Sequence, residues 1–365
     1  MGKKKIALLV TNNLEKDQRV NKVSYSLMNF GFDVTTIGSK SRPCKEYVTP
    51  YTNKRLYVFF KHGFLFYLEI NIRFFLFLLF SDFDVYVAND TDSLIAAFFA
   101  GKIKNKPIVV DLHELFPEVP EVVNRRFVKF VWTKIEDFIL PKISNGYTVC
   151  KSIADYYAKR YGISLKVVRN VPHFSAYKGK KDEFKDLTGK KIILYQGAVN
   201  VGRGIEWIME AMKYIDDSVF VVVGNGDLYD ELKARSNQNE FQGKVLFMGP
   251  VPYSNLQNYT LSADLGVCLL DNVGLSYYYS LPNRIFDFMQ CHVPILATDF
   301  PEISNVVNTY STGKTISYHD SERLALVIKG MLKESVDHEK FDFAANSINW
   351  EKEENILHEI YDQFL

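Results

Sequence analysis

A single carboxylate stands on an otherwise apolar helix face in the segment PNRIFDFM. This segment places Asp287 among Ile285, Phe286 and Phe288, after an apolar run and a polar, glycine-containing loop. Where a strand leads through a loop into a helix, unpaired N–H groups and the helix dipole together attract anions. A carboxylate on that helix can accept hydrogen bonds from two hydroxyl groups of a ribose. These residue types predict a site for a phosphorylated nucleoside.

A glycine-rich loop, GAVNVGRG, occupies residues 197–204 between a predicted strand and a predicted helix. It superficially matches the P-loop pattern, but Arg203 replaces the lysine and Gly204 removes the hydroxyl that would hold magnesium. The loop therefore does not indicate a nucleoside triphosphatase. Arg203 can still bind a diphosphate through two parallel hydrogen bonds. Arg284, on the same predicted helix as Asp287, is either a second phosphate contact or a solvated helix residue.

Histidine and carboxylate side chains gather after two further predicted strands. Asp111 and His113 follow the strand at 107–110, at the end where doubly wound folds place their chemistry. Asp90 and Asp92 follow the strand at 84–88 and form an Asp-x-Asp pair. The pair is either a divalent-metal site or, in the interpretation that we prefer, part of the start of the next helix, where Asp90 or Thr91 is the cap and further negative charge is favourable in the first turn. No histidine and cysteine spacing matches a zinc site, and no nucleophile triad is evident.

Apolar runs alternate with helical apolar spacing along most of the chain, which is typical of doubly wound α/β domains. We expect strands at 5–10, 32–37, 84–88, 107–110, 147–150 and 166–169, and helices at 17–29, 94–100, 127–140 and 152–161. After a polar segment, the pattern restarts with strands at 192–196, 219–223, 245–248, 265–270 and 293–297, and helices at 206–214, 281–289 and 350–364. Ser280 is predicted to cap the helix at 281–289, with Pro282 in its first turn.

PNRIFDFM and the following PILATDFPEI together resemble the donor-site signature of the family 4 retaining glycosyltransferases. These enzymes have the GT-B fold, so the resemblance implies an α/β protein with two Rossmann-like, doubly wound domains facing across a cleft. We expect an acceptor-side domain at 1–174, a linker at 175–190 and a nucleotide-sugar donor domain at 191–345. A final helix within 346–365 is expected to return to the first domain.

The resemblance also implies roles for individual residues. Asp287 matches the second carboxylate of the family's Glu-x7-Glu pair, shortened by one methylene, and would hold the ribose. Arg203 matches the basic residue of the diphosphate loop, and His113 stands where the family frequently has a histidine beside the donor sugar. We take these three as catalytic. The expected substrate-binding residues are Gly202, Gly274, Leu275, Ser276, Tyr279, Arg284, Asn12 and Asn13.

Two positions depart from the family pattern. Tyr279 stands where the family has its first glutamate, and Ala198 stands where it has a second basic residue. Because a tyrosine offers one hydroxyl and an apolar ring, we expect a donor sugar of altered polarity at that edge, such as a deoxy or acetamido sugar.

The function that the resemblance implies is retaining transfer of a sugar from a nucleoside-diphosphate sugar to a glycan or lipid-linked acceptor, as in polysaccharide biosynthesis. The nucleotide-sugar is a co-substrate, and we expect no metal, no other cofactor and no nucleic-acid partner. Two alternatives stay open: a nucleotide-sugar epimerase of the same fold, and a catalytically weak nucleotide-sugar-binding subunit.

The distribution of charge and cysteine indicates where the protein acts. The net charge is +1, but residues 1–170 hold 26 Lys and Arg against 16 Asp and Glu, whereas residues 171–365 hold 18 against 27. A basic half suggests an anionic partner, unless the asymmetry is ordinary surface drift. The four cysteines are scattered, Cys268 and Cys291 lie in apolar runs, and no signal peptide is evident. We therefore expect a cytoplasmic protein.

Residues 56–80, LYVFFKHGFLFYLEINIRFFLFLLF, are unusually rich in phenylalanine. On a helical wheel, Glu69 and Arg73 fall on one face and nearly everything else is apolar. The segment is interrupted by too many polar residues to read as a simple membrane span, so it is either core or a surface in contact with lipid. Because basic residues flank it, we expect a peripheral enzyme on the inner face of an anionic membrane.

Overall fold

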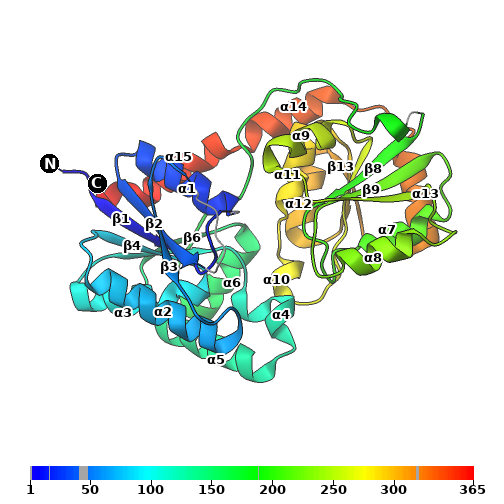
Figure 1. Cartoon of the computed structure of the whole chain (residues 1–365). Coiled ribbons are helices and arrows are strands. Elements are labelled where there is room, and N and C mark those ends of the chain that lie inside the picture. The colour runs from blue at the N-terminus through cyan, green and yellow to red at the C-terminus, as the bar shows by residue number, and fades with distance from the viewer. Residues whose placement is uncertain (1, 16, 41–47, 188, 318–319) are drawn as a thin grey trace. The chain divides into compact units, whose positions relative to one another are not determined.

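The computed structural model describes the whole chain except residues 1, 16, 41–47, 188 and 318–319, so Cys44 lies outside the described residues. The chain forms two compact units (Figure 1). Unit 1 consists of Met1–Asn170 and Glu353–Leu365, and unit 2 consists of Val171–Lys352.

The described part of unit 1 is built around a seven-stranded sheet in the order β3-β2-β1-β4-β5-β6-β7, with every neighbouring pair parallel. Its strands are β1 (Lys5–Leu9), β2 (Asp33–Lys40), β3 (Thr52–Tyr57), β4 (Val85–Asn89), β5 (Ile108–Leu112), β6 (Asn145–Thr148) and β7 (Lys166–Val167). The central strands β1, β4 and β5 are almost entirely buried, as the continuous apolar runs predict for a parallel sheet covered on both faces.

Helices cover both faces of this sheet. They are α1 (Gln18–Asn29), α2 (Gly63–Leu79), α3 (Thr91–Lys104), α4 (Pro120–Val123), α5 (Arg126–Ile139), α6 (Lys151–Tyr161) and the C-terminal α15 (Trp350–Tyr361), with 3-10 turns η1 (Phe116–Glu118), η2 (Leu140–Lys142) and η4 (Asp362–Phe364). Figure 1 shows α1 and α15 on one face and α2, α3 and α5 on the other. Asp17 caps α1 by accepting a hydrogen bond from the Val20 N–H.

The described part of unit 2 has a six-stranded parallel sheet in the order β10-β9-β8-β11-β12-β13. Its strands are β8 (Lys191–Gln196), β9 (Ser218–Val223), β10 (Val245–Gly249), β11 (Leu265–Cys268), β12 (Ile295–Thr298) and β13 (Gly313–Ile316). Its helices are α7 (Ile205–Met212), α8 (Tyr229–Ser236), α9 (Tyr253–Leu261), α10 (Leu275–Tyr278), α11 (Asn283–Gln290), α12 (Pro301–Tyr310), α13 (Ser321–Met331) and α14 (His338–Ser347), with the 3-10 turn η3 (Lys185–Leu187). The two sheets confirm the predicted α/β class with two Rossmann-like halves.

The start of α11 differs from the prediction. The N-cap residue is Pro282, and no side chain caps the helix. The Ser280 hydroxyl instead donates to the Tyr277 carbonyl at 2.8 Å, so the predicted Ser280 cap is wrong. The cause is the short helix α10, which ends two residues before Ser280 and offers its last carbonyls to that hydroxyl.

Two connecting segments are fixed by polar contacts within their own units. In unit 2, the Ser175 N–H donates to Gln290, and Lys180 pairs with Asp264 at 2.6 Å. In unit 1, Arg169 pairs with Glu353 of α15 at 2.8 Å. The polar stretch after residue 171 therefore lies along unit 2, and the last residues of the chain pack on unit 1.

Candidate functional site

Asp287 lines a hollow of about 300 Å³ in unit 2. It lies on α11, half-buried, and accepts a hydrogen bond from Gln196 Nε2 at 3.0 Å. Gln196 is the last residue of β8, and its other side-chain atom accepts from the Thr260 hydroxyl at 2.8 Å. Gln290 also lines the hollow, and its Nε2 is a buried donor without a partner among the described residues. The hollow thus combines an oriented carboxylate with an unsatisfied donor, which suits a ligand rich in hydroxyl groups.

Two guanidinium groups lie around the carboxyl end of β11. Arg284 is buried, with its Cζ 4.3 Å from the ring centre of Tyr195, and Arg203 has its Cζ 4.5 Å from the ring centre of Tyr277. Burial raises the pKa of the Cys268 thiol on β11, and both guanidinium groups are near enough to oppose that rise.

Each of these guanidinium groups has one N–H donor that is not satisfied by the described residues. Arg284 Nη1 and Arg203 Nε are buried and have no hydrogen-bond partner among the described residues. A buried, unpaired N–H on a cation is costly, so the arrangement indicates an anion that completes it. Arg284 is therefore a buried residue and not a solvated helix residue.

The loop carrying Arg203 is held in a shape that side chains would prevent. Gly204 has φ +68°, and a Cβ there would lie 2.5 Å from the Cβ of Leu269. Gly224, which follows β9, has φ +145°, and its Cβ would lie 1.9 Å from the Gly197 carbonyl oxygen. Glycine is required at both positions because only glycine combines positive φ with such close approach. These contacts set the path of the loop from residue 197 to Arg203.

The predicted loop at 274–276 is the start of α10, so its local structure was predicted wrongly. Gly274 is the N-cap residue, Leu275 is exposed and Ser276 is buried. Tyr279 follows at the C-terminal end of α10, half-buried, with its ring centre 5.2 Å from that of Tyr278. Gly202 lies beside this segment, because a Cβ there would contact Val273 at 3.3 Å and Tyr277 at 3.4 Å.

In unit 1, His113 follows β5 and lies between two carboxylates. Its Nδ1 is 3.1 Å from Asp90 Oδ2, and its Nε2 is 3.0 Å from Asp111 Oδ2. Burial disfavours the imidazolium, but Asp111 and Asp90 outweigh it and raise the pKa of His113 well above its usual value. Asp111 also pairs with the buried Arg19 at 2.8 Å. His113 is therefore held as a cation between two carboxylates, and its buried Nε2 lies within ion-pair distance of Asp111 without a hydrogen bond of good geometry.

The predicted capping role of Asp90 is wrong. Asp90 occupies the N-cap position of α3, but its side chain makes no cap hydrogen bond, and its Oδ1 accepts from the His113 N–H at 2.7 Å. Its φ of 60° turns the carboxylate toward the end of β5 rather than the helix. Within the described ranges, no three His, Cys, Asp or Glu side chains are arranged to hold a metal ion.

Asn12 and Asn13 lie exposed in the loop after β1, and both side chains shape that loop. Asn12 Oδ1 accepts from the Leu14 N–H at 2.7 Å, and Asn13 Oδ1 accepts from the Glu15 N–H at 3.3 Å. Asn12 Nδ2 also donates to Asp17, the cap of α1.

Four residues that line the Asp287 hollow were not predicted from the sequence: Gln196, Tyr253, Thr260 and Gln290. Gln196 ends a predicted strand, and that position could have identified it. Tyr253 and Thr260 belong to α9, for which no helical period was recognised. Asp90 was missed as a partner of His113 because its position before a helix favoured a cap.

The phenylalanine-rich segment forms α2, which buries only one side. Ile70, Asn71, Phe74 and Leu78 are buried, and Glu69 pairs with Arg73 at 2.7 Å as expected. The opposite side is apolar and exposed, with Phe64 69% and Phe80 87% exposed, together with Leu65, Leu68, Ile72 and Leu76. None of the helices in the described part of the chain has the length and apolar character needed to span a bilayer.

Two family models match the chain. The model described as Glycosyltransferase Family 4 matches residues 20–174, and the model described as Glycosyl transferases group 1 matches residues 190–334. Together they cover most of both units.

Curated relatives are similar over part of their length. A chitobiosyldiphosphodolichol beta-mannosyltransferase of Candida albicans is 25% identical over 56% of this chain and 50% of its own length. The enzyme of that name from Pongo abelii is 32% identical over 29% of this chain and 22% of its own length. The chain thus spans half or less of the length of these relatives.

Solved structures share the fold across nearly the whole chain. Sucrose-phosphate synthase from Thermosynechococcus elongatus has a TM-score of 0.82 at 17% identity, covering 99% of both chains. The Anabaena protein HepE in complex with UDP-glucose has a TM-score of 0.76 at 14% identity, covering 98% of this chain and 99% of its own.

Proposed function

The chain belongs to the GT-B glycosyltransferases of family 4 and group 1, and from that premise we propose that it transfers a sugar from a nucleoside-diphosphate sugar to a lipid-linked acceptor at a membrane surface. The observation that carries the donor half of this proposal is the pair of guanidinium groups of Arg203 and Arg284, each of which has one buried N–H without a partner among the described residues. A diphosphate is the anion that such a pair fits best, since guanidinium binds phosphate oxygens in parallel.

The chemistry proposed for this site is electrostatic. As the bond between the sugar and the diphosphate breaks, negative charge develops on the leaving phosphate oxygens. Arg203 and Arg284 neutralise that charge, and Asp287 holds the nucleoside through its ribose hydroxyl groups. No metal ion is part of this proposal. For His113, the candidate of unit 1, we propose the role of a positive charge that orients the donor sugar, because Asp111 and Asp90 raise its pKa and keep it protonated.

The acceptor half of the proposal is supported by unit 1. The exposed apolar side of α2 lies in a half of the chain with an excess of basic residues. Apolar side chains beside cations suit the surface of an anionic membrane. The relatives from Candida albicans and Pongo abelii are named for an acceptor that carries a diphosphodolichol, which is a lipid. We propose a cytoplasmic enzyme acting on the inner face of the membrane.

Stereochemistry is a separate part of the proposal. The family resemblance implies retention, whereas the names of the curated relatives specify a beta product. A sugar that leaves an α-linked donor and arrives in a β linkage has been inverted at its anomeric carbon. The one-bond carbon–proton coupling of that carbon in the product distinguishes the two: a product of the donor's configuration supports retention, and the opposite configuration assigns inversion.

A screen of UDP-, GDP- and dTDP-sugars for thermal stabilisation tests the donor, because a ligand that binds only the native state raises the melting temperature. The stabilising donor is then incubated with and without a polyprenyl-diphosphate glycan. Transfer only with the acceptor supports the proposal. Isomerisation of the sugar without any acceptor would assign the nucleotide-sugar epimerase alternative, and binding without turnover would assign the binding subunit.

A further inference from the structure

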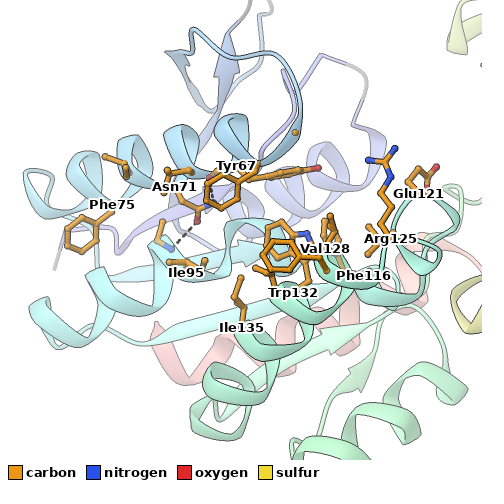
Figure 2. A pocket seen from close by; sticks show the side chains of 18 of the residues that line it. Tyr67, Asn71, Phe75, Ile95, Phe116, Glu121, Arg125, Val128, Trp132 and Ile135 are labelled. Atoms are coloured by element: carbon orange, nitrogen blue, oxygen red, sulfur yellow. Dashed lines mark hydrogen bonds between the residues drawn. The ribbon is translucent and has the colours of Figure 1, made fainter.

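Unit 1 contains a cavity of about 610 Å³ under its exposed apolar surface, within the range typical of small-molecule sites. The cavity lies among α2, α3, α4 and α5 (Figure 2). Trp132 and Phe116 form part of its wall, with their ring centres 4.9 Å apart, and Tyr67 packs edge-on against Trp132 at 5.2 Å. The wall is thus predominantly aromatic and aliphatic.

The polar group in the cavity floor is already satisfied. Asn71 Nδ2 donates to the carbonyls of Tyr67 at 2.9 Å and Asp92 at 2.7 Å, and its Oδ1 accepts from the Ala96 N–H at 3.2 Å. Burial raises the pKa of Tyr67 to about 12, and the carboxylates of Asp92, Glu114 and Glu121 add to the rise, so its hydroxyl stays neutral. A floor of this kind selects a ligand without polar groups.

The charged side chains lie at one end. Figure 2 shows Glu121 and Arg125 at one end of the cavity and Phe75 at the other. Arg125 is exposed, and its neighbour Arg126, which does not line the cavity, is exposed as well. A ligand that fits this polarity has an apolar body and an anionic head beside Arg125.

We propose that this cavity binds one hydrocarbon chain of an anionic lipid, the phosphate-bearing lipid of the acceptor. The apolar wall takes the chain, and Arg125 pairs with the phosphate at the mouth. Some of the residues that line the cavity are also exposed and would present an apolar surface to the bilayer: Phe64, Leu68 and Ile72 on α2, and Phe127 on α5. This inference rests on the proposed lipid-linked acceptor.

Binding is tested on the full chain without any donor, using 11-bromoundecyl phosphate below its micellar concentration. Bromine near the end of the chain quenches the fluorescence of Trp132, and Trp132→Phe identifies the part of the signal that comes from the cavity. Each methylene that leaves water increases the binding constant about fourfold, so shortening the probe by two methylenes should weaken binding about sixteenfold. Quenching that is absent, or equal for both lengths, would overturn the proposal.

Matched variants separate the wall from the mouth. Val131→Phe adds a ring to a half-buried position that lines the cavity, whereas Thr133→Phe adds the same ring on α5 outside it. Only Val131→Phe should lower probe affinity, by tenfold or more, with an unchanged melting temperature showing that the fold persists. If the two variants behave alike, the chain does not occupy the cavity.

Arg125→Gln should weaken the phosphate probe about tenfold and leave undecanol unaffected, because a charge-assisted contact is lost. Arg126→Gln is the control and should change little. If Arg125→Gln and Arg126→Gln lower the affinity for the phosphate probe equally, only the general surface charge attracts the probe. That result would overturn the proposed contact between Arg125 and the head group.

The outcomes for the cavity and for the enzyme remain distinguishable. If the probe binds but no sugar is transferred to polyprenyl-diphosphate glycans, the proposed lipid binding in the cavity is supported and the proposed function is contradicted. Transfer with the same KM in wild type and Val131→Phe would keep the function and contradict the cavity. The proposal predicts that Val131→Phe raises the KM for a long-chain acceptor relative to wild type. For an acceptor truncated to a short chain, the KM of Val131→Phe should equal that of wild type.

Discussion

The side-chain amide of Gln196 donates a hydrogen bond to Oδ2 of Asp287 across 3.0 Å. This bond joins the end of β8 to the middle of α11 and fixes the orientation of the carboxylate, because Gln196 is itself held by Thr260. A carboxylate that is fixed before the ligand arrives loses little side-chain entropy on binding. Asp287 is therefore oriented in advance for the proposed contact with ribose hydroxyl groups.

Removing either the Arg203 or the Arg284 guanidinium group should weaken binding of the donor nucleotide. Arg203→Ala and Arg284→Ala each remove a charge-assisted phosphate contact and should cost about 1.5–3 kcal/mol of nucleoside-diphosphate binding. Titration calorimetry with UDP and GDP measures the loss. Arg235→Ala, at a half-buried position of α8 where the guanidinium group pairs with Glu210, removes the same charge elsewhere in unit 2 and should have little effect on nucleotide binding. Unchanged affinity in both site variants would show that the two groups do not form the diphosphate site.

Tyr279 is expected to contact the donor sugar. Tyr279→Phe removes the hydroxyl and Tyr279→Glu restores the family's carboxylate, so the two changes should alter kcat/KM in different ways between a hydroxylated donor and its deoxy or acetamido analogue. Steady-state kinetics with the identified donor and one analogue measure this. Wild-type values for both variants would show that Tyr279 is not a sugar contact.

Glu136 should make unit 1 less stable at alkaline pH. It is buried and accepts hydrogen bonds from Thr91 at 2.7 Å and Tyr161 at 2.8 Å, and burial raises its pKa to about 7. Because the folded pKa lies above the unfolded one, the stabilisation is complete below about pH 4.3 and is lost as the pH rises through 7. Wild type should therefore lose free energy of unfolding between pH 5 and pH 8, whereas Glu136→Gln should not. The difference between the two proteins should change by on the order of 3 kcal/mol over this range, in favour of Glu136→Gln. Urea unfolding at both pH values measures this, with Glu354→Gln as a control that should track wild type.

The buried pair of Arg19 and Asp111 should be costly to break. Burial opposes ionisation of Asp111, but Arg19 and His113 outweigh it and lower its pKa to about 2. Asp111→Asn leaves Arg19 buried beside a neutral group and should destabilise unit 1 by about 3–5 kcal/mol near neutral pH. Asp155→Asn breaks an exposed pair with Lys151 and should change the free energy of unfolding by less than about 1 kcal/mol. Equal effects of the two changes would show that burial does not determine the strength of the Asp111 pair.

Most of the sheets and two parts of the site follow from local sequence. Continuous apolar runs predicted the central strands, and strand–loop–helix order predicted where Arg203 and Asp287 would lie. β3 was not predicted because its residues TNKRLY are polar, as suits an edge strand. Likewise, the bond between Asp90 and His113 depends on β4 and β5 being neighbours in the sheet, which local capping preferences do not encode.

Whether α2 is buried on all sides or exposes an apolar side was open for a related reason. A helix that is apolar all round can be buried or can face lipid, and composition does not decide between the two. The structure shows which residues α3 covers and which it leaves exposed. Arg284 illustrates the converse, because a charged residue near a helix start is usually solvated, and only the packing of Tyr195 against it revealed a buried cation.

The most direct test of the nucleotide-sugar site is a calorimetric titration of UDP, GDP and inorganic pyrophosphate into wild type, Asp287→Ala and the charge-matched control Asp230→Ala. The account predicts that wild type binds at least one of the two nucleotides. It also predicts that Asp287→Ala weakens that nucleotide at least tenfold while leaving pyrophosphate nearly unchanged, because the partner of Asp287 is the ribose, and that Asp230→Ala behaves as wild type. An unchanged nucleotide affinity in Asp287→Ala, or an equal loss for nucleotide and pyrophosphate, would contradict it.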